Sequence, residues 1–251
     1  MRLAGKNVLI TGAGGQLGKC FVKAFASEGA NIWLIDSSAN SLLKAKELVP
    51  KKRLLGASAL DITDPQSVQD FFLKTQEKFS LDILVNNAGI GVFTSFWERS
   101  YEEFMQVLSV NVGGTFLCTR EALRIMKERG TGSIINIGSI YGVISSDPRI
   151  YVNSNRMNSE VYSASKAAVI HMTKYFATHA ASMGVRVNCV SPGGVYRNHG
   201  EEFVKHYSQR TPLGRMANET EICGAVVFLA TPESEYITGQ NIIVDGGMSS
   251  W

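Results

Sequence analysis

Tyr162 and Lys166 are four residues apart, and Ser139 precedes this pair by 23 residues. Residues at this spacing share one face of a helix. A lysine ammonium beside a phenol favours its ionised form and so lowers the phenol's pKa from its usual value near ~10. A general acid or base that works near neutral pH needs such a shift. Ser139 ends the apolar run 134–137, where it can bind the same substrate oxygen. The three residues predict proton transfer at a carbonyl or alcohol oxygen.

A tyrosine and lysine at this spacing also occur by chance, so the pair carries weight only through its context. That context begins with the apolar segment 7–11, which reads as a buried strand. Glycines follow at positions 12, 14, 15 and 18, and apolar residues then recur at helical spacing up to Glu28 and Gly29. The pattern predicts a strand, a glycine turn and a helix.

The next strand, 31–35, leads into Asp36, which lies 18 residues after Gly18. Glycines let backbone amides approach a pyrophosphate, and the helix amino terminus stabilises its charge. An acid about 20 residues further on can bind a ribose diol. A glycine-rich strand exit alone is often a tight turn, but the correctly placed acid favours dinucleotide binding.

Further motifs follow in a fixed order, and together they resemble the short-chain dehydrogenase/reductase family over nearly the whole chain. They are Thr11–Gly18, Asp61, Asn86-Asn87-Ala88-Gly89, Asn111, Ser139, Tyr162 with Lys166, Pro192-Gly193, Thr238-Gly239-Gln240 and Val244-Asp245-Gly246-Gly247.

The resemblance implies a catalytic tetrad of Asn111, Ser139, Tyr162 and Lys166, with Asp61 at the adenine ring. An alternative for Asn111 is a packing or helix-capping residue without a catalytic role. The cofactor-binding residues implied in this way are Thr11, Gly12, Gly15, Gln16, Leu17, Gly18, Asp36, Asp61, Ile62, Asn87, Ala88, Gly89, Tyr162, Lys166, Pro192, Gly193 and Val195.

The chain departs from the family pattern at three places. Gln16 stands where single-domain members usually have glycine, although the pyrophosphate turn is expected to survive. The hydroxyl residue that often follows the Pro192-Gly193 pair to hold the nicotinamide amide is missing. The interval from Ser139 to Tyr162 is longer than usual, so residues 140–161 carry an insertion.

The insertion is rich in polar and turn-forming residues, and it lies between two catalytic positions. We therefore expect it to overhang the substrate cleft, where its amides, hydroxyls and arginines suit a hydroxylated or anionic substrate. An oligomer contact or a solvated flap is an equal alternative. By family analogy residues 194–215 form a substrate lid. The candidate substrate residues are Arg149, Asn153, Arg156 and Tyr196.

Strand and helix patterns alternate along the chain, with strands near 7–11, 31–36, 53–60, 82–86, 133–138, 185–190 and 241–245. This α/β pattern predicts a doubly wound, parallel, seven-stranded Rossmann sheet with helices on both faces. No linker or repeat divides the sequence, so residues 1–251 are expected to form a single domain that binds the dinucleotide and carries out catalysis.

The net charge of +3 comes from scattered basic residues, without the stripe that a nucleic-acid-binding face requires. No apolar run is long enough to cross a membrane and no signal segment is visible, so we expect a cytoplasmic protein. The four cysteines are widely spaced, which predicts buried free thiols and no metal site.

The motifs thus predict an NAD(P)-dependent oxidoreductase that moves a hydride to or from a secondary alcohol or ketone. The insertion and residues 191–197 resemble reductases of bacterial nonulosonate and surface-glycan sugar pathways, which favours a polar sugar-like substrate. Residues 212–215 and the carboxyl terminus equally resemble 3-oxoacyl-carrier-protein reductases. A non-catalytic dinucleotide sensor is a third alternative, which the intact tetrad disfavours.

Two further expectations concern the cofactor and the assembly. Asp36 would repel a 2′-phosphate, and neither Ser37 nor the glycine turn supplies a basic residue, so NAD is expected in preference to NADP. Family members commonly pack the helices at 111–127 and 162–181 against symmetry mates. The stripe Ile170, Thr173, Phe176 and Ala177 therefore suggests a homotetramer, although packing on the sheet also produces such stripes.

Overall fold

A computed structural model describes residues 1–152 and 157–251 of the chain. Seven parallel strands form one sheet in the order β3-β2-β1-β4-β5-β6-β7. The strands are β1 Asn7–Thr11, β2 Asn31–Asp36, β3 Leu54–Ala59, β4 Ile83–Asn86, β5 Gly132–Ile137, β6 Val185–Pro192 and β7 Asn241–Val244. The order reverses between β1 and β4, and the carboxyl ends of strands at such a switch point form a ligand-binding crevice.

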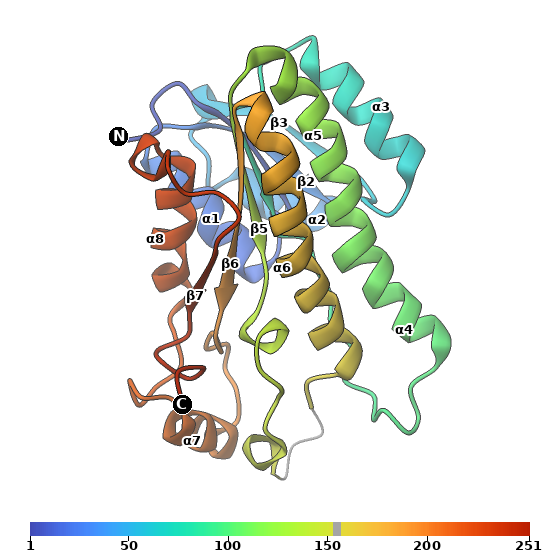
Figure 1. The fold of residues 1–251 in the computed structure, drawn as a ribbon, viewed down its shortest axis with the longest axis vertical. Helices are drawn as coiled ribbons and strands as arrows, with labels where there is room; N and C mark the ends of the chain where they lie inside the picture. The colour runs from blue at the N-terminus through green and yellow to red at the C-terminus, as the bar shows by residue number, and fades with distance from the viewer. Residues whose placement is uncertain (153–156) are drawn as a thin grey trace.

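Helices cover both faces of the sheet (Figure 1). One face carries α1 Gln16–Ser27, α2 Ala39–Lys46 and α8 Glu219–Ala230. The other carries α3 Pro65–Gln76, α5 Thr115–Arg129 and α6 Glu160–Ala180. Helix α4, Tyr101–Leu108, runs through a π-helical segment η2, Ser109–Gly114, into α5. Helix α7, Glu201–Arg210, lies beyond the carboxyl end of the sheet, near the end of the chain (Figure 1).

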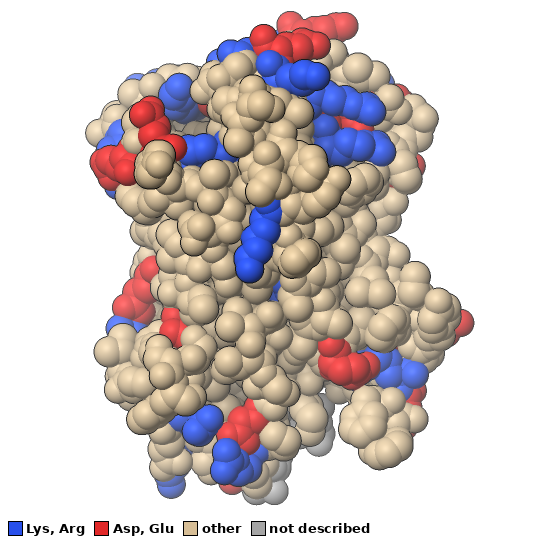
Figure 2. Space-filling view, in the orientation of Figure 1, with Lys and Arg blue, Asp and Glu red and all other residues tan. Residues whose placement is uncertain are grey.

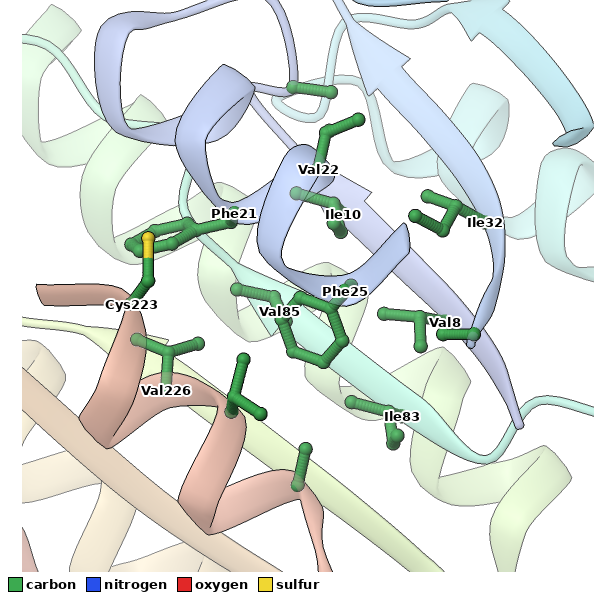
Figure 3. Packing of buried hydrophobic residues seen from close by; sticks show 14 of the residues in the cluster. Val8, Ile10, Phe21, Val22, Phe25, Ile32, Ile83, Val85, Cys223 and Val226 are labelled. Carbon is green, nitrogen blue, oxygen red and sulfur yellow. The ribbon is translucent and has the colours of Figure 1, made fainter. Parts of the chain in front are cut away.

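The strands are apolar because helices bury them from both sides. Figure 3 shows Val8, Ile10 and Val85 of the sheet packed against Phe21 and Phe25 of α1. All five side chains are completely buried. Burial of one large apolar side chain stabilises a fold by about 1.5–3 kcal/mol, so this layer holds β1 firmly beneath the glycine turn.

Short 3₁₀ turns connect the main elements: η1 Lys51–Arg53, η3 Ile140–Gly142, η4 Pro148–Tyr151, η5 Ala181–Met183 and η6 Pro232–Ser234. Turns η3 and η4 belong to the insertion; η3 packs against α6, and η4 packs against α7. A small separate core forms there from Ile140, Ile150, Tyr207, Met216 and Met248. The insertion and the lid segment therefore share one hydrophobic cluster at the mouth of the crevice.

The structure confirms the predicted fold class, with each strand within one or two residues of its expected bounds. The helix expected to start at Asn111 instead continues from Tyr101, with Asn111 inside the π-helical segment. All four cysteines are buried and free, as expected. Within residues 1–152 and 157–251, no helix combines the length and the apolar character needed to cross a bilayer.

Candidate active site

The amino terminus of α1, which follows the glycine turn, presents backbone amides to the crevice. Helix α1 begins after Gly15 with no side-chain cap and no acidic residue in its first turn, so its first N–H groups are available to an anion. Gly12 has a φ of 61°, and a Cβ on it would lie 2.7 Å from Ala88 Cα. A Cβ on Gly18 would lie 2.0 Å from the Gly12 carbonyl oxygen. These close approaches explain the glycines, and the turn fits a pyrophosphate group.

Asp36, at the end of β2, is held beside this turn. One carboxylate oxygen accepts a hydrogen bond from the Gly14 N–H at 3.0 Å, and the other accepts from the Ser38 N–H at 2.9 Å. The side chain lines the same cavity as Gly12 and Gly15. The carboxylate is therefore fixed in the same cavity as the glycine turn.

Thr11 and Asn87 join the ends of β1 and β4 behind the cavity wall. Thr11 Oγ1 accepts hydrogen bonds from the N–H groups of Asn87 and Ala88, both at 3.1 Å. The Asn87 side-chain amide donates to the carbonyl oxygens of Thr11 and Gly12, at 3.0 and 2.9 Å. Thr11 is fully buried and is not part of the lining, so the structure gives it a positioning role in place of the expected cofactor contact.

A cavity of about 1090 Å³ extends from the turn to the insertion. Apart from Thr11, every residue expected to bind the cofactor lines it: Gly12, Gly15, Gln16, Leu17, Gly18, Asp36, Asp61, Ile62, Asn87, Ala88, Gly89, Tyr162, Lys166, Pro192, Gly193 and Val195.

The structure brings Ser139, Tyr162 and Lys166 together in this cavity. Ser139 follows β5, and it shares a hydrogen bond with the Tyr162 hydroxyl. Ser159 caps α6 by accepting from the Tyr162 N–H at 3.2 Å. Lys166 lies one turn further along α6, with Nζ 5.7 Å from the centre of the Tyr162 ring. The cap therefore orients the helix turn that carries the phenol.

Burial sets the protonation of this group. Burial raises the pKa of Tyr162, and the hydrogen bond with Ser139 opposes that rise only in part. Burial also lowers the pKa of Lys166 to about 8. Lys166 Nζ donates to the Ile137 carbonyl oxygen at 2.8 Å. The expected depression of the Tyr162 pKa by Lys166 is therefore not seen, because desolvation dominates at both residues. Tyr162 is a protonated phenol that can donate to a substrate oxygen.

Asn111 lies behind the lining, in the π-helical segment. Its side-chain oxygen accepts from the Ile90 N–H at 2.8 Å, and its amide donates to the Ile90 carbonyl oxygen at 3.0 Å and to Ser165 Oγ at 2.9 Å. A Cβ on Gly89 would lie 3.2 Å from Asn111 Oδ1 and 3.3 Å from Lys166 Nζ. Asn111 therefore joins the chain at Ile90 to Ser165 of α6, close to Gly89 and Lys166.

The insertion reaches the cavity through residues other than those expected. Tyr141, Tyr151 and Asn158 line it. Arg149 is exposed, pairs at 2.8 Å with Asp147 and is not among the residues that line the cavity. Asn153 and Arg156 lie outside the described residues.

Tyr196 is also placed differently from the expectation. Its side chain is exposed and does not line the cavity, while its carbonyl oxygen accepts a hydrogen bond from Gln16 Nε2 at 3.1 Å. Gln16, the departure in the glycine turn, thus connects that turn to the lid segment. No motif predicts this contact, because 180 residues separate the two partners.

The expected lid segment also lines the cavity, through Arg197, Asn198, His199, Phe203 and Tyr207. The Gly194 N–H donates to the Tyr207 hydroxyl, which lies 13 residues further along the chain. Burial raises the pKa of Tyr207 to about 12, so the hydroxyl stays protonated. A lid tyrosine therefore holds the segment after Pro192-Gly193, where the usual hydroxyl residue is missing.

Comparison with known proteins supports this arrangement. A family model described as enoyl-(acyl carrier protein) reductase matches residues 12–249. The chain belongs to the short-chain dehydrogenase/reductase family. It is 37% identical over 256 residues to a 3-oxoacyl-(acyl-carrier-protein) reductase of Thermotoga maritima, covering 99% of both chains. It is 34% identical to the galactitol 2-dehydrogenase (L-tagatose-forming) of Cereibacter sphaeroides, covering 100% of this chain and 97% of that protein.

Two solved structures have the same fold as this chain. The enzyme from Leptospira borgpetersenii serovar Hardjo-bovis, with bound NAD⁺, is 43% identical, with a TM-score of 0.89 over 99% of this chain and 94% of that one. A gluconate 5-dehydrogenase of Burkholderia cenocepacia, in complex with NADP and tartrate, is 29% identical, with a TM-score of 0.90 over 100% and 97%. The protein is thus a nicotinamide-dependent oxidoreductase of the short-chain dehydrogenase/reductase family, acting on a CH–OH or C=O group.

Proposed function

We propose that this enzyme uses NAD(H) to interconvert a secondary alcohol and a ketone on a polar, hydroxylated substrate. The observation that carries the proposal is the lining of the cavity beyond Tyr162. Hydroxyl, amide and guanidinium groups face it from the insertion and the lid: Tyr141, Tyr151, Asn158, Arg197 and Asn198. Such groups bind oxygen atoms and would remain unpaired beside an alkyl chain.

The residues of the site divide the work of the reaction. Tyr162 gives its phenolic proton to the carbonyl oxygen in reduction, and its phenolate form takes the proton from the alcohol in oxidation. Ser139 Oγ hydrogen-bonds the same oxygen and stabilises the charge that develops there. Lys166 places a buried positive charge beside Tyr162 and the cofactor cleft. The nicotinamide, when bound, supplies or accepts the hydride.

Asp36 is the basis for proposing NAD rather than NADP. A carboxylate binds both hydroxyls of an adenosine ribose but repels a 2′-phosphate at that place. The residues around it that line the cavity are Gly12, Gly15, Ser37 and Asp61, none of which carries a positive charge. The related Leptospira structure contains NAD⁺, whereas the Burkholderia structure contains NADP, so relatives of this chain use both cofactors.

Relatives favour two substrate classes. The galactitol 2-dehydrogenase and a 2-dehydro-3-deoxy-D-gluconate 5-dehydrogenase of Bacillus subtilis, 35% identical, act on polyols and sugar acids by name. The Thermotoga reductase acts on an acyl-carrier-protein thioester by name. The polar lining favours the first class, and the second remains the alternative because of its 37% identity.

A cofactor-coupled assay tests the proposal and separates the two classes. Purified protein is given NAD⁺ with galactitol and gluconate, and NADH with acetoacetyl thioesters, and absorbance at the nicotinamide band is followed. We expect Tyr162-dependent turnover of the polyols. Turnover of the thioester without turnover of the polyols would reverse the assignment. If neither the wild-type protein nor Tyr162→Phe turned over any of these compounds, the result would support a non-catalytic dinucleotide sensor.

We also propose a homotetramer, on a different observation from the one that the sequence suggested. Thr173 and Ala177 are buried against the sheet, so packing within the chain explains much of that stripe. Exposed apolar side chains nevertheless remain on α4, α5 and α6: Met105, Phe116 and Tyr175. Figure 2 shows few charges across the middle of this side of the molecule. A uniform 27.4 kDa species in light scattering at micromolar concentrations would contradict the proposal.

Two organisational expectations stay proposals. Residues 1–251 are proposed to act as one domain, since the insertion, the lid and the glycine turn all line one cavity. A cytoplasmic location is proposed because enzymes of this kind use NAD(H) in the cytoplasm. Limited proteolysis and cell fractionation test them respectively.

A further inference from the structure

Two tyrosines of unassigned role form a hydroxyl pair beside the catalytic group. The hydroxyl oxygens of Tyr141 and Tyr151 lie 2.7 Å apart. Tyr141 lies two residues after Ser139, in η3, and Tyr151 ends η4 in the insertion. Both side chains line the cavity that contains Ser139 and Tyr162. The pair is therefore placed to contact whatever is bound next to the catalytic hydroxyls.

A count of hydrogens shows that the pair has one donor left for a ligand. Burial raises the pKa of both phenols, so each carries its hydrogen at neutral pH. One phenol then donates to the other, and either can be the donor. Whichever it is, the hydrogen of the second phenol is not used within the pair, and a buried donor needs an acceptor.

Packing fixes both rings before any ligand arrives. The Tyr151 ring lies against Phe203 of α7, with 5.5 Å between the ring centres. Its neighbour Ile150 is buried in the small core that joins the insertion to the lid. The Tyr141 N–H donates to Ser139 Oγ at 3.2 Å, which ties this residue to the catalytic serine. Preorganised groups of this kind bind a ligand with little further ordering cost.

The position of the pair defines which ligand oxygen it meets. Ser139 and Tyr162 hold the oxygen on the reacting carbon. Tyr141 follows Ser139 in the adjoining 3₁₀ turn and donates its N–H to Ser139 Oγ, and the Tyr151 hydroxyl lies 2.7 Å from the Tyr141 hydroxyl. An oxygen bound by the pair is thus a near neighbour of the reacting oxygen along the substrate.

We infer that the hydroxyl pair of Tyr141 and Tyr151 binds a hydroxyl group on the carbon next to the reacting carbon. The enzyme therefore selects α-hydroxy ketones and vicinal diols over simple ketones and alcohols. This inference rests on the proposed function and names the feature of the substrate that the site reads. A substrate hydroxyl can accept the spare phenolic hydrogen and donate its own in return.

Two small ketones that differ by this one hydroxyl test the inference. Reduction of 3-hydroxy-2-butanone and of 2-butanone by NADH is measured with the wild-type enzyme and with Tyr151→Phe. The substitution removes the oxygen and keeps the ring against Phe203. We expect wild type to prefer the hydroxy ketone by roughly tenfold or more in kcat/KM. In the variant the preference should shrink to about twofold, through a loss on the hydroxy ketone alone.

Matched variants separate recognition from folding. Tyr236→Phe makes the same change at a fully exposed tyrosine and should leave both ketones unaffected. Tyr141→Phe should reproduce the selective loss, and it decides the question if Tyr151→Phe does not fold, as judged by circular dichroism and NADH affinity.

Three results would overturn the inference. The wild-type enzyme could reduce both ketones equally well, or it could reduce neither. Either result would show that the enzyme does not recognise the neighbouring hydroxyl group. Alternatively, both phenylalanine variants could lose the two activities in parallel, which would indicate a structural role for the pair. The proposed function is judged separately, by Tyr162-dependent turnover of polyols, so its failure is distinguishable from the failure of this inference.

Discussion

The carboxylate of Asp36 accepts a hydrogen bond from the Gly14 N–H at 3.0 Å, which couples the end of β2 to the glycine turn. The acid and the turn meet here although 22 residues separate them. Because the turn fixes the carboxylate, its charge cannot swing away from the ribose side of the cavity without losing this bond. The proposed preference for NAD therefore rests on the charge of one side chain.

We predict that the enzyme binds NAD⁺ at least roughly tenfold more tightly than NADP⁺, on the order of 1.4 kcal/mol. One unfavourable charge contact supplies that difference. Asp36→Ala combined with Ser37→Arg should invert the preference, because the repulsion is removed and a phosphate partner is added. Isothermal titration of both cofactors measures it, and Asp36→Asn is the matched control for charge alone. Equal affinities in the wild type would show that Asp36 does not face the ribose.

Lys166 is expected to lower the stability of the fold while it serves catalysis. Its pKa is lowered to about 8 by burial, from 10.5. Below pH 8 the ammonium is protonated in both the folded and unfolded protein, and its desolvation cost is fully present. As the pH rises from about 8 to 10.5 the unfolded state holds the proton longer, so stability increases relative to a variant without the amine.

Lys166→Met should therefore be inactive and more stable at pH 7, on the order of 2 kcal/mol in the free energy of unfolding after the lost bond to Ile137 is allowed for. The difference should shrink towards pH 10. Urea unfolding of both proteins at pH 7 and pH 10 gives the comparison. A variant that is less stable than wild type at pH 7 would contradict this account of the buried charge.

Substitution of Arg149 and substitution of Asp147 should have very different effects on the kinetics, although the two residues form an ion pair. Arg149 is exposed, and exposed pairs contribute about 0–1 kcal/mol, so Arg149→Ala should leave kcat/KM within about twofold. Asp147 also caps η4 and lies 3.3 Å from Arg210 Nε of α7. Asp147→Ala should therefore loosen the insertion from the lid and raise KM about threefold or more, with the loss of a cap costing about 1 kcal/mol. Steady-state kinetics of both variants with galactitol test this prediction. A large effect of Arg149→Ala on kcat/KM would indicate that Arg149 does contact the substrate.

The sequence predicted those features whose causes are local or follow from strand order. The strand, glycine turn and helix at 7–27 depend on neighbouring residues alone, and the structure has them. Ser139 and Tyr162 meet because β5 and α6 are consecutive major elements on the same side of the crevice.

Features that depend on long-range packing could not be predicted from the sequence. The bond from Gln16 to Tyr196 spans 180 residues, and the hydroxyl pair of Tyr141 and Tyr151 depends on how the insertion folds against α7. The predicted direction of the Tyr162 pKa shift was wrong, because helical spacing reveals the neighbouring charge of Lys166 but not the burial that raises the pKa of Tyr162.

The central claim is that Tyr162 donates and accepts the proton while hydride moves, and Tyr162→Phe tests it most directly. The variant keeps the ring and loses only the hydroxyl, so NADH affinity by fluorescence titration should stay within about threefold. Turnover of a polyol verified with the wild type should fall by about 10²–10⁴-fold in kcat, the range for a lost general acid or base. A phenylalanine variant that binds NADH normally and retains the wild-type kcat would contradict the mechanism.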